Sequence, residues 1–262
     1  MTSADALRTG ALRRVRHVLG LGRLLPLGGP SGGAWIVERA ADAVLRREAA
    51  AAVPDARLTW LRLGLAAPSE GTGAPDSAGA GAAGSAGGGA AGSAGGDTAA
   101  LGPVPPGALP REPLCIEAEF AAWPRQPLPD LAAALRTALL AAAEERLGLD
   151  VVRADLTVTE LLDGTPAEAA DAGHPPEGEP VRHLAGRVEG DPVARAVAGT
   201  AGVVGLTSEL GHAVQIAADH ARVEVATARD ARALDVARAV SAAASRALGD
   251  DRPVTVLISA VS

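Results

Sequence analysis

The order of apolar and polar positions predicts the same series of elements twice along the chain, at residues 34–162 and, shortened, at 192–262. In the first copy, residues 114–120 alternate apolar with mostly polar side chains, which is typical of a strand. Residues 128–147 follow with the spacing of a helix, and residues 151–162 close the copy as a strand. The second copy has the same order, with strands at 221–225 and 253–258 on either side of a helix at 231–248.

Earlier elements complete each copy. In the first, a helix is expected to begin near Ala34 and to end before Pro54, and residues 57–65 form a near-continuous apolar run that predicts a strand buried on both faces. In the second, a short helix starting at Pro192 precedes two short apolar segments. The pattern therefore predicts an α+β fold of two α-β-β-α-β repeats, with the helices packed on small, largely antiparallel sheets.

Three segments interrupt or flank the repeats. Residues 67–112 are predicted to be a disordered insertion between two strands, because 77–96 contain only Ala, Gly and Ser and are flanked by Pro-bearing segments. Residues 163–190 are rich in Pro, Gly and Glu and predict a flexible acidic linker.

The third segment, residues 1–25, places apolar residues among arginines and predicts a basic amphipathic helix. Such a helix could dock on an anionic membrane surface or a protein partner, or it could cover its own domain. The candidate contact residues are its five arginines, Arg8, Arg13, Arg14, Arg16 and Arg23.

Charge and cysteine content restrict the class of protein. The net charge is −7, yet residues 1–66 hold ten Arg against five acidic residues, so the rest of the chain is strongly acidic and repels phosphate. Neither repeat combines a basic face with stacking aromatics, and no nucleic-acid partner is expected. The single cysteine, Cys115, cannot form an intramolecular disulfide, which suits a reducing, cytoplasmic compartment. No stretch of the sequence is apolar for long enough to span a bilayer.

Candidate catalytic residues are few. The histidines show no metal-binding spacing, and no metal site is predicted. Cys115 shares a strand face with Glu117 and Glu119, and carboxylates beside a thiol oppose thiolate formation, which argues against a nucleophile. Glu117 and Glu119 indicate the solvated face of a strand rather than an acid–base pair. The glycines at 28–33 lack the Lys-Ser/Thr of a phosphate-binding loop and indicate a hinge. No catalytic residue and no cofactor are predicted.

One series of residues in the second copy points to a family. Gly202-Val203-Val204-Gly205-Leu206 is followed by Val214-Gln215-Ile216, a charged turn, a strand at 221–225, an amphipathic helix and a terminal Val/Ile strand. This series resembles the alkaline-shock protein family of Gram-positive envelopes, also called the Gls envelope-stress family. The resemblance covers residues 192–262; the first copy matches in element order only and lacks the glycine motif near Val53.

The resemblance implies a small, non-enzymatic α+β module that gathers at the inner face of the envelope through membrane-anchored partners. The expected function is thus that of an interaction module, envelope or stress associated, acting in the cytoplasm through protein partners, self-association or the inner membrane surface. The alternative is a small-ligand-binding protein or enzyme with its site between the two repeats.

Overall fold

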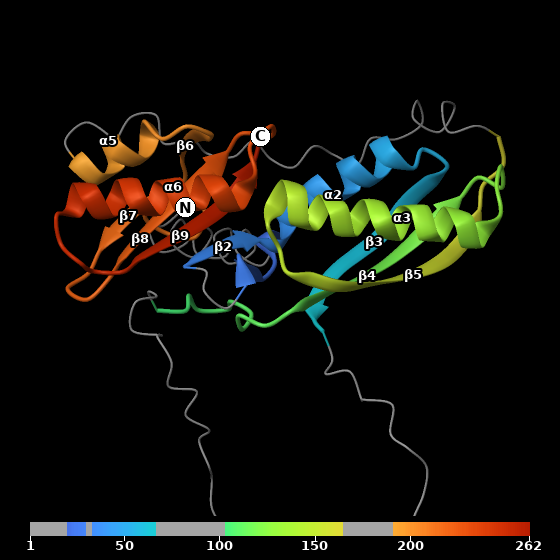
Figure 1. Cartoon of the computed structure of the whole chain (residues 1–262), viewed down its shortest axis with the longest axis horizontal. Coiled ribbons are helices and arrows are strands. Elements are labelled where there is room, and N and C mark those ends of the chain that lie inside the picture. The colour runs from blue at the N-terminus through green and yellow to red at the C-terminus, as the bar shows by residue number, and fades with distance from the viewer. Residues whose placement is uncertain (1–19, 30–32, 67–102, 165–190) are drawn as a thin grey trace, which may run out of the picture.

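The computed structural model describes residues 20–29, 33–66, 103–164 and 191–262, which form an α+β protein with helices packed on two sheets (Figure 1). The first part of the chain contains β1 (Leu24–Leu27), β2 (Ala34–Val37), α2 (Glu38–Ala52), β3 (Ala56–Leu65), β4 (Leu114–Ala122), α3 (Leu128–Ala142), the π-helical turn η3 (Ala143–Leu147) and β5 (Val151–Leu161). The second part contains α5 (Pro192–Ala198), β6 (Val203–Leu206), β7 (Val214–Ile216), β8 (Ala221–Thr227), α6 (Ala233–Leu248) and β9 (Val254–Val261).

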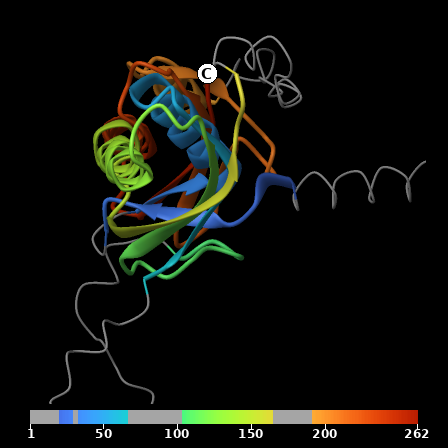
Figure 2. The same ribbon diagram turned by 90° about the vertical axis from the view of Figure 1, so that its right-hand side faces the viewer.

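The smaller sheet has the order β3-β4-β5, with β4 antiparallel to β3 and parallel to β5. Alternation along β4 buries Ile116, Ala118 and Phe120 and leaves Glu117 and Glu119 exposed, as the sequence predicted. Helices α2 and α3 cover the buried face, where α3 contributes leucines spaced four residues apart, at 131, 135 and 139. Figure 2 shows both helices on the same side of these strands.

The larger sheet has the order β1-β2-β9-β8-β6, and β7 also pairs with β8. β6 and β7 are antiparallel to β8, whereas β9 is parallel to it. Helices α5 and α6 pack beside each other over this sheet, and α6 buries Val236, Ala237 and Val240. Asp191 caps α5 by accepting hydrogen bonds from the backbone N–H groups of Val193 (2.9 Å) and Ala194 (3.4 Å).

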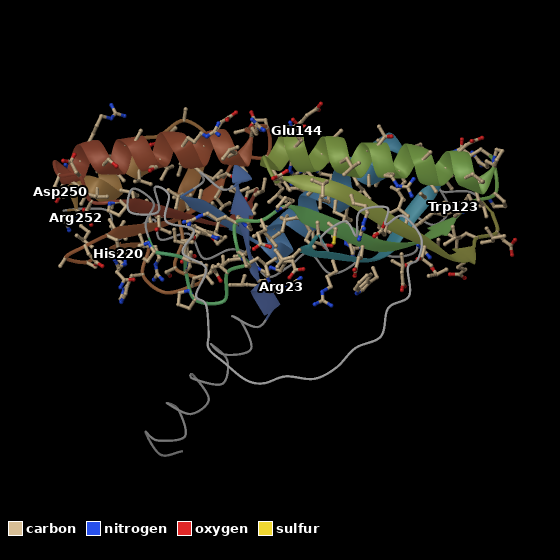
Figure 3. All side chains as sticks on the ribbon, turned by 60° about the horizontal axis from the view of Figure 1, so that its bottom comes forward. Arg23, Trp123, Glu144, His220, Asp250 and Arg252 are labelled. Atoms are coloured by element: carbon tan, nitrogen blue, oxygen red, sulfur yellow. The ribbon has the colours of Figure 1, made fainter. Side chains whose placement is uncertain are left out.

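Two units in the chain share one order of elements. The series α2-β3-β4-α3-β5 has the same element types and the same pairing, antiparallel then parallel, as α5-β6-β8-α6-β9, with β7 added to the second. Helices α6 and α3 lie roughly end to end in Figures 1 and 3. The origin of both units from one ancestral repeat stays a prediction.

The first helix begins later than its predicted start near Ala34. Residues 34–37 form β2, which pairs in parallel with β9 through Ala34, Trp35 and Ile36, so the start of the first predicted repeat belongs to the sheet of the second unit. Four consecutive apolar residues fit either a helix or a short buried strand, and here all four are buried. The pairing with β9 decides in favour of the strand.

The predicted N-terminal helix does not extend to residue 25. Residues 24–27 form β1, antiparallel to β2, and Pro26 lies within this short strand opposite Trp35. A proline lacks the N–H of a ladder bond and is therefore confined mainly to edge strands and bulges. Residues 1–19 lie outside the described residues.

The predicted insertion ends earlier than residue 112. Ala108 forms a bridge with Leu24, the Leu109 N–H donates to the Leu24 carbonyl (2.8 Å), and the Arg111 guanidinium lies 4.6 Å from the centre of the Trp35 ring. Residues 108–111 thus contact β1 and β2. The rest of the insertion, 67–102, and the linker at 165–190 lie outside the described residues.

β3 is not buried on both faces, contrary to the prediction from its apolar run. Only Ala56 and Leu63 are fully buried, and Trp60 keeps 42% of its surface exposed. The reason is position, because β3 is the outer strand of a three-stranded sheet with helices on one face.

The two units meet at a close contact around Leu234, which lies at the start of α6. The Gly28 N–H donates to the Gly148 carbonyl (2.9 Å), and both glycines have positive φ and lie against the Leu234 side chain. Two arginines bridge the same junction, since Arg146 donates to the Arg229 carbonyl (2.6 Å) and Arg232 donates to the Glu144 carbonyl (3.0 Å). Figure 3 places Glu144 where α3 and α6 meet.

Candidate interaction surface

The exposed large apolar side chains among the described residues lie mainly on strands. Isolated surface apolar residues are normal, but several of these lie on the same strands of the two sheets. They are Trp60 and Leu65 on β3, Val152, Val158 and Leu161 on β5, Val204 on β6, Ile216 on β7, and Val104 in the segment before β4. The strands, rather than the helices, therefore offer the apolar contact surface.

Charged side chains cover the outer edge of β3. The Glu38 carboxylate accepts from the Leu63 N–H (3.3 Å), Arg23 donates to the Leu63 carbonyl, and Arg46 donates to the Leu58 carbonyl (2.9 Å). Edge strands are blocked in this way against pairing with other chains.

The edge of β5 has no comparable cover among the described residues. β5 pairs with β4 on one side only, and most of its residues are exposed, including Val152 at 59% and Leu161 at 56%. One side chain bonds its backbone from outside the sheet, because Arg136 of α3 donates to the Ala154 carbonyl (2.9 Å). β5 is thus a long strand with an open edge.

Arg23 is held in place by its own domain. Its guanidinium donates to both carboxylate oxygens of Glu38 (3.3 and 3.2 Å), and its backbone N–H donates to the same carboxylate (3.2 Å). Burial raises the pKa of Glu38, yet the bonds from Arg23 and Leu63 outweigh it and leave that pKa below its usual value. Arg23 therefore stabilises the β3 edge, while Arg8, Arg13, Arg14 and Arg16 lie outside the described residues.

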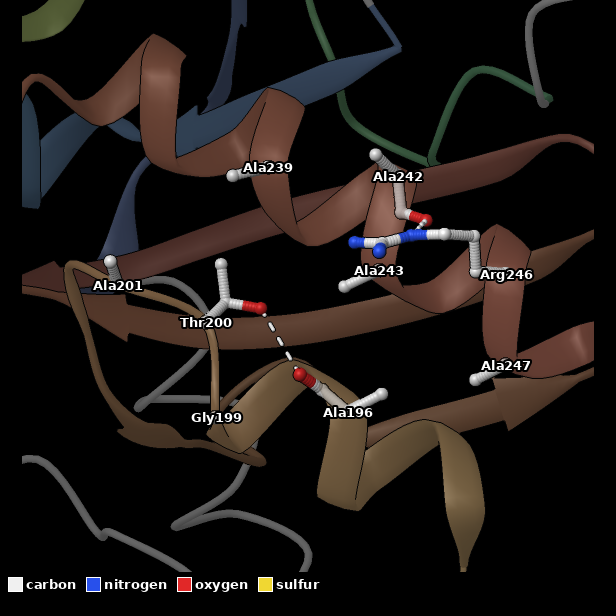
Figure 4. Close-up of a pocket in the computed structure, with 9 residues that line it drawn as sticks. All are labelled: Ala196, Gly199, Thr200, Ala201, Ala239, Ala242, Ala243, Arg246 and Ala247. Carbon is white, nitrogen blue, oxygen red and sulfur yellow. Dashed lines mark hydrogen bonds between the residues drawn. The ribbon is translucent and has the colours of Figure 1, made fainter.

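A groove of about 650 Å³ lies between α5 and α6, within the second unit (Figure 4). Its wall is made largely of alanines, with Thr200 and Arg246 as polar members. Both polar side chains bond to a backbone carbonyl four residues earlier in the chain. The Thr200 hydroxyl donates to the Ala196 carbonyl (3.1 Å), and Arg246 donates to the Ala242 carbonyl (3.2 Å). This groove is a shallow seam between small side chains and lies away from the junction of the units.

A buried carboxylate, Glu224, organises the loop after β6. Glu224 is fully buried and accepts hydrogen bonds from the Thr207 hydroxyl (2.9 Å) and from the backbone N–H groups of Glu209 (2.7 Å) and Leu210 (3.0 Å). The Thr207 hydroxyl also lies 2.6 Å from the Ser259 hydroxyl. Burial raises the pKa of Glu224, although these donors oppose the shift. The alternation of β8 gave no sign of this role, because it is equally compatible with an exposed glutamate.

The raised pKa of Glu224 predicts a specific dependence of stability on pH. Between its unfolded value, near 4.5, and its higher folded value, the folded state binds more protons than the unfolded state. The contribution of Glu224 to the free energy of unfolding therefore falls as the pH rises through this window and is constant above it. Glu38, whose pKa is lowered, makes the opposite contribution, which is lost as the pH falls through its folded value.

Glu224→Gln should remove the decline above pH 4.5, as seen by urea unfolding across the acidic range, whereas Glu38→Gln should leave that decline in place. A wild-type profile with no such decline, or an identical profile in Glu224→Gln, would contradict the prediction.

The remaining candidates for chemistry are paired locally. The His220 imidazole lies 2.8 Å from the Asp219 carboxylate, and the hydrogen bond from His220 lowers the pKa of Asp219. Nearby, Arg252 donates to Asp250 (2.8 Å) and to the Ala217 carbonyl (2.6 Å), at the outer end of the second unit in Figure 3. His212 is exposed, whereas His17, His174 and His183 lie outside the described residues.

Cys115 is buried, with its thiol 3.4 Å from the Leu65 carbonyl. In the described part of the chain, no group of three or more His, Cys, Asp or Glu side chains is placed to hold a metal ion.

Comparison with protein-family models, with curated proteins and with solved structures found no match for this chain. The resemblance of residues 192–262 to the alkaline-shock family stays a prediction. None of the described helices has the length and apolar character needed to cross a membrane.

Proposed function

We propose that this protein is a non-enzymatic interaction module that acts through protein partners, in association with the cell envelope and its stress response. The observation that carries the proposal is the open edge of β5, which presents exposed apolar side chains and backbone groups that no described strand pairs. Extended segments of other chains bind such edges through main-chain hydrogen bonds, with side-chain contacts giving specificity. Two of the other outer strands support this interpretation, because side chains cover part of β3 and a packed segment covers part of β1.

We further propose that the N-terminal arginines bring the module to the inner surface of the cell membrane. The support is the amphipathic pattern of residues 5–25 and the resemblance of the second unit. Basic residues near an anionic surface each contribute about 1 kcal/mol at physiological salt, so four of them suffice for reversible attachment.

The test of membrane attachment must leave the fold intact. A deletion through residue 25 would remove Leu21, Leu24 and Leu25, which are buried, and Arg23, which binds Glu38. We therefore expect a variant with Arg8, Arg13, Arg14 and Arg16 changed to Gln to keep the wild-type thermal midpoint and to lose flotation with anionic phosphatidylglycerol vesicles. Equal flotation of variant and wild type, or no flotation of either, would contradict membrane attachment through these residues.

Partner binding is tested separately by pull-down from native lysate. We expect the wild-type chain to capture a reproducible protein, and we expect Val158→Pro, on the β5 edge, to lose it. Arg62→Glu, on the exposed part of β3, is the matched control and should keep it. Retained capture in Val158→Pro would place the binding surface elsewhere, and absence of any specific capture would count against the module.

A further inference from the structure

We propose that two copies of this chain pair through β5, antiparallel and about a twofold axis at Leu156, to form a continuous sheet. This inference rests on the proposed function and names the occupant of its open edge.

The backbone groups of β5 alternate between β4 and the open edge. The Leu114 N–H donates to the Asp150 carbonyl, which directs the even-numbered residues of β4 towards β5. Because Ala154 lies opposite Ile116 in a parallel pair, it turns its own N–H and carbonyl outwards, consistent with the bond from Arg136 to that carbonyl. Residues 154, 156 and 158 therefore present their donors and acceptors along the open edge.

A copy placed antiparallel with Leu156 opposite itself satisfies these groups. Leu156 then exchanges two hydrogen bonds with its counterpart, and Ala154 does so with Val158 on either side, the Ala154 carbonyl using its second lone pair beside the bond from Arg136. These three residues pair with Ile116, Ala118 and Phe120, so their side chains all lie on the helix-covered face. Apolar side chains thus meet apolar side chains across the pair, and Val158, which is 36% exposed, becomes covered.

On the face of the sheet away from the helices, this antiparallel register places opposite charges of the two copies near each other. Arg153 pairs with Cys115 and Glu160 with Ala121, which places both side chains on the face away from the helices. The pairing of β5 with β4 shifts at Thr159, so Thr159 and Glu160 together lie opposite Arg153 of the second copy. Arg153 is also bonded to Asp155 within its own strand (2.9 Å), and each half of the pair gains an Arg153 to Glu160 contact by symmetry.

The chain itself contains an example of this edge being covered. β9 has the same place in the second unit as β5 has in the first, as the last strand, parallel to the central one and preceded by a helix. The outer side of β9 carries β2, paired through Ala34, Trp35 and Ile36. β2 is fully buried and already pairs with β9, so it cannot also cover β5. A second copy must therefore supply the strand that covers β5, and its own β5 has the open edge to do so.

The test is sedimentation velocity of the full chain over a range of concentrations. We expect the wild type to form a concentration-dependent dimer. Arg153→Glu and Glu160→Arg each place like charges opposite each other at both symmetry-related contacts, and each should raise the dimer dissociation constant about tenfold. The double variant restores opposite charges and should recover the wild-type dissociation constant. Arg62→Glu, a charge reversal on β3, is the control and should dimerise like the wild type.

Val158→Pro provides an independent test, because it removes an N–H that points to the open edge and leaves the hydrogen bonds to β4 in place. We expect this variant to be monomeric. A monomeric wild type, a double variant that is folded but stays monomeric, or a dimer equally stable in all variants would overturn the pairing. A monomeric wild type that still captures a protein from lysate overturns self-pairing alone. If the chain forms a dimer that the charge reversals weaken, but captures no protein from lysate and does not float with vesicles, the proposed function is overturned while the self-pairing is supported.

Discussion

Replacing Gly148 by Ala should lower the free energy of unfolding by about 2 to 5 kcal/mol, because it combines two separate costs. Gly148 ends the π-helical turn with φ of 80°, a left-handed conformation that side-chain-bearing residues adopt at a cost. A Cβ there would also lie 2.4 Å from the Leu234 Cβ, closer than any real contact. The junction between the units would have to open to relieve this clash.

The measurement is denaturant unfolding followed by circular dichroism, with Gly249→Ala as the matched control. Gly249 ends α6 with φ of 71°, and a Cβ there meets nothing within 4 Å. The free energy of unfolding of this control should therefore fall only by the cost of the left-handed backbone conformation, about 1 to 2 kcal/mol. Equal losses in both variants would show that the contact with Leu234 contributes nothing.

Replacing Glu224 by Ala should cost a similar amount, about 3 to 5 kcal/mol at neutral pH, through unsatisfied hydrogen bonds. The substitution leaves the backbone N–H groups of Glu209 and Leu210 without their acceptor in a buried site, while the Thr207 hydroxyl keeps Ser259. Truncating the side chain also opens a cavity. Because these bonds hold the loop after β6, its amide hydrogens should exchange faster in the variant.

Glu117→Ala is the control for this second experiment. Glu117 lies at the middle of β4, the central strand of the smaller sheet, but its side chain is exposed. Its removal should change the stability by no more than about 0.5 kcal/mol. A loss for Glu224→Ala no larger than this, or unchanged exchange of the Glu209 and Leu210 amides, would contradict the assigned role.

Much of the fold could be predicted from local pattern. The alternation along β4, the leucine spacing of α3 and the apolar strand β9 each specify their element without information from elsewhere in the chain. Both units show the expected order of helix and strand because these segments carry a clear period.

What the pattern missed depended on distant partners. Trp35 and Ile36 form a strand that lies between β1 and β9, and nothing near residue 35 indicates the second of these neighbours. The exposure of Trp60 follows from the edge position of β3, which is a property of the whole sheet. The run of leucines around it looks the same in a central strand.

The candidate site was predicted only in outline. An interaction module was expected, yet the covering of β3 by Glu38 and Arg46 and the open edge of β5 emerge only from the assembled sheets. Arg23 carried the same sequence signal as the other N-terminal arginines, and its ion pair with Glu38, fifteen residues away, separates it from them. A charge within an amphipathic pattern does not reveal whether its counter-ion is a lipid or a neighbour in the fold.

The parallel pairing of β2 with β9 also sets an order for biosynthesis. Residues 34–36 are translated about 220 residues before their partners, residues 256–258. The nascent chain must therefore carry Trp35 and its apolar neighbours without β9 until that intervening stretch has been translated. In truncated translation products that stop before β9, β2 could pair with β1 on one side but would leave its other edge open, so we expect chaperones and quality-control proteases to recognise them.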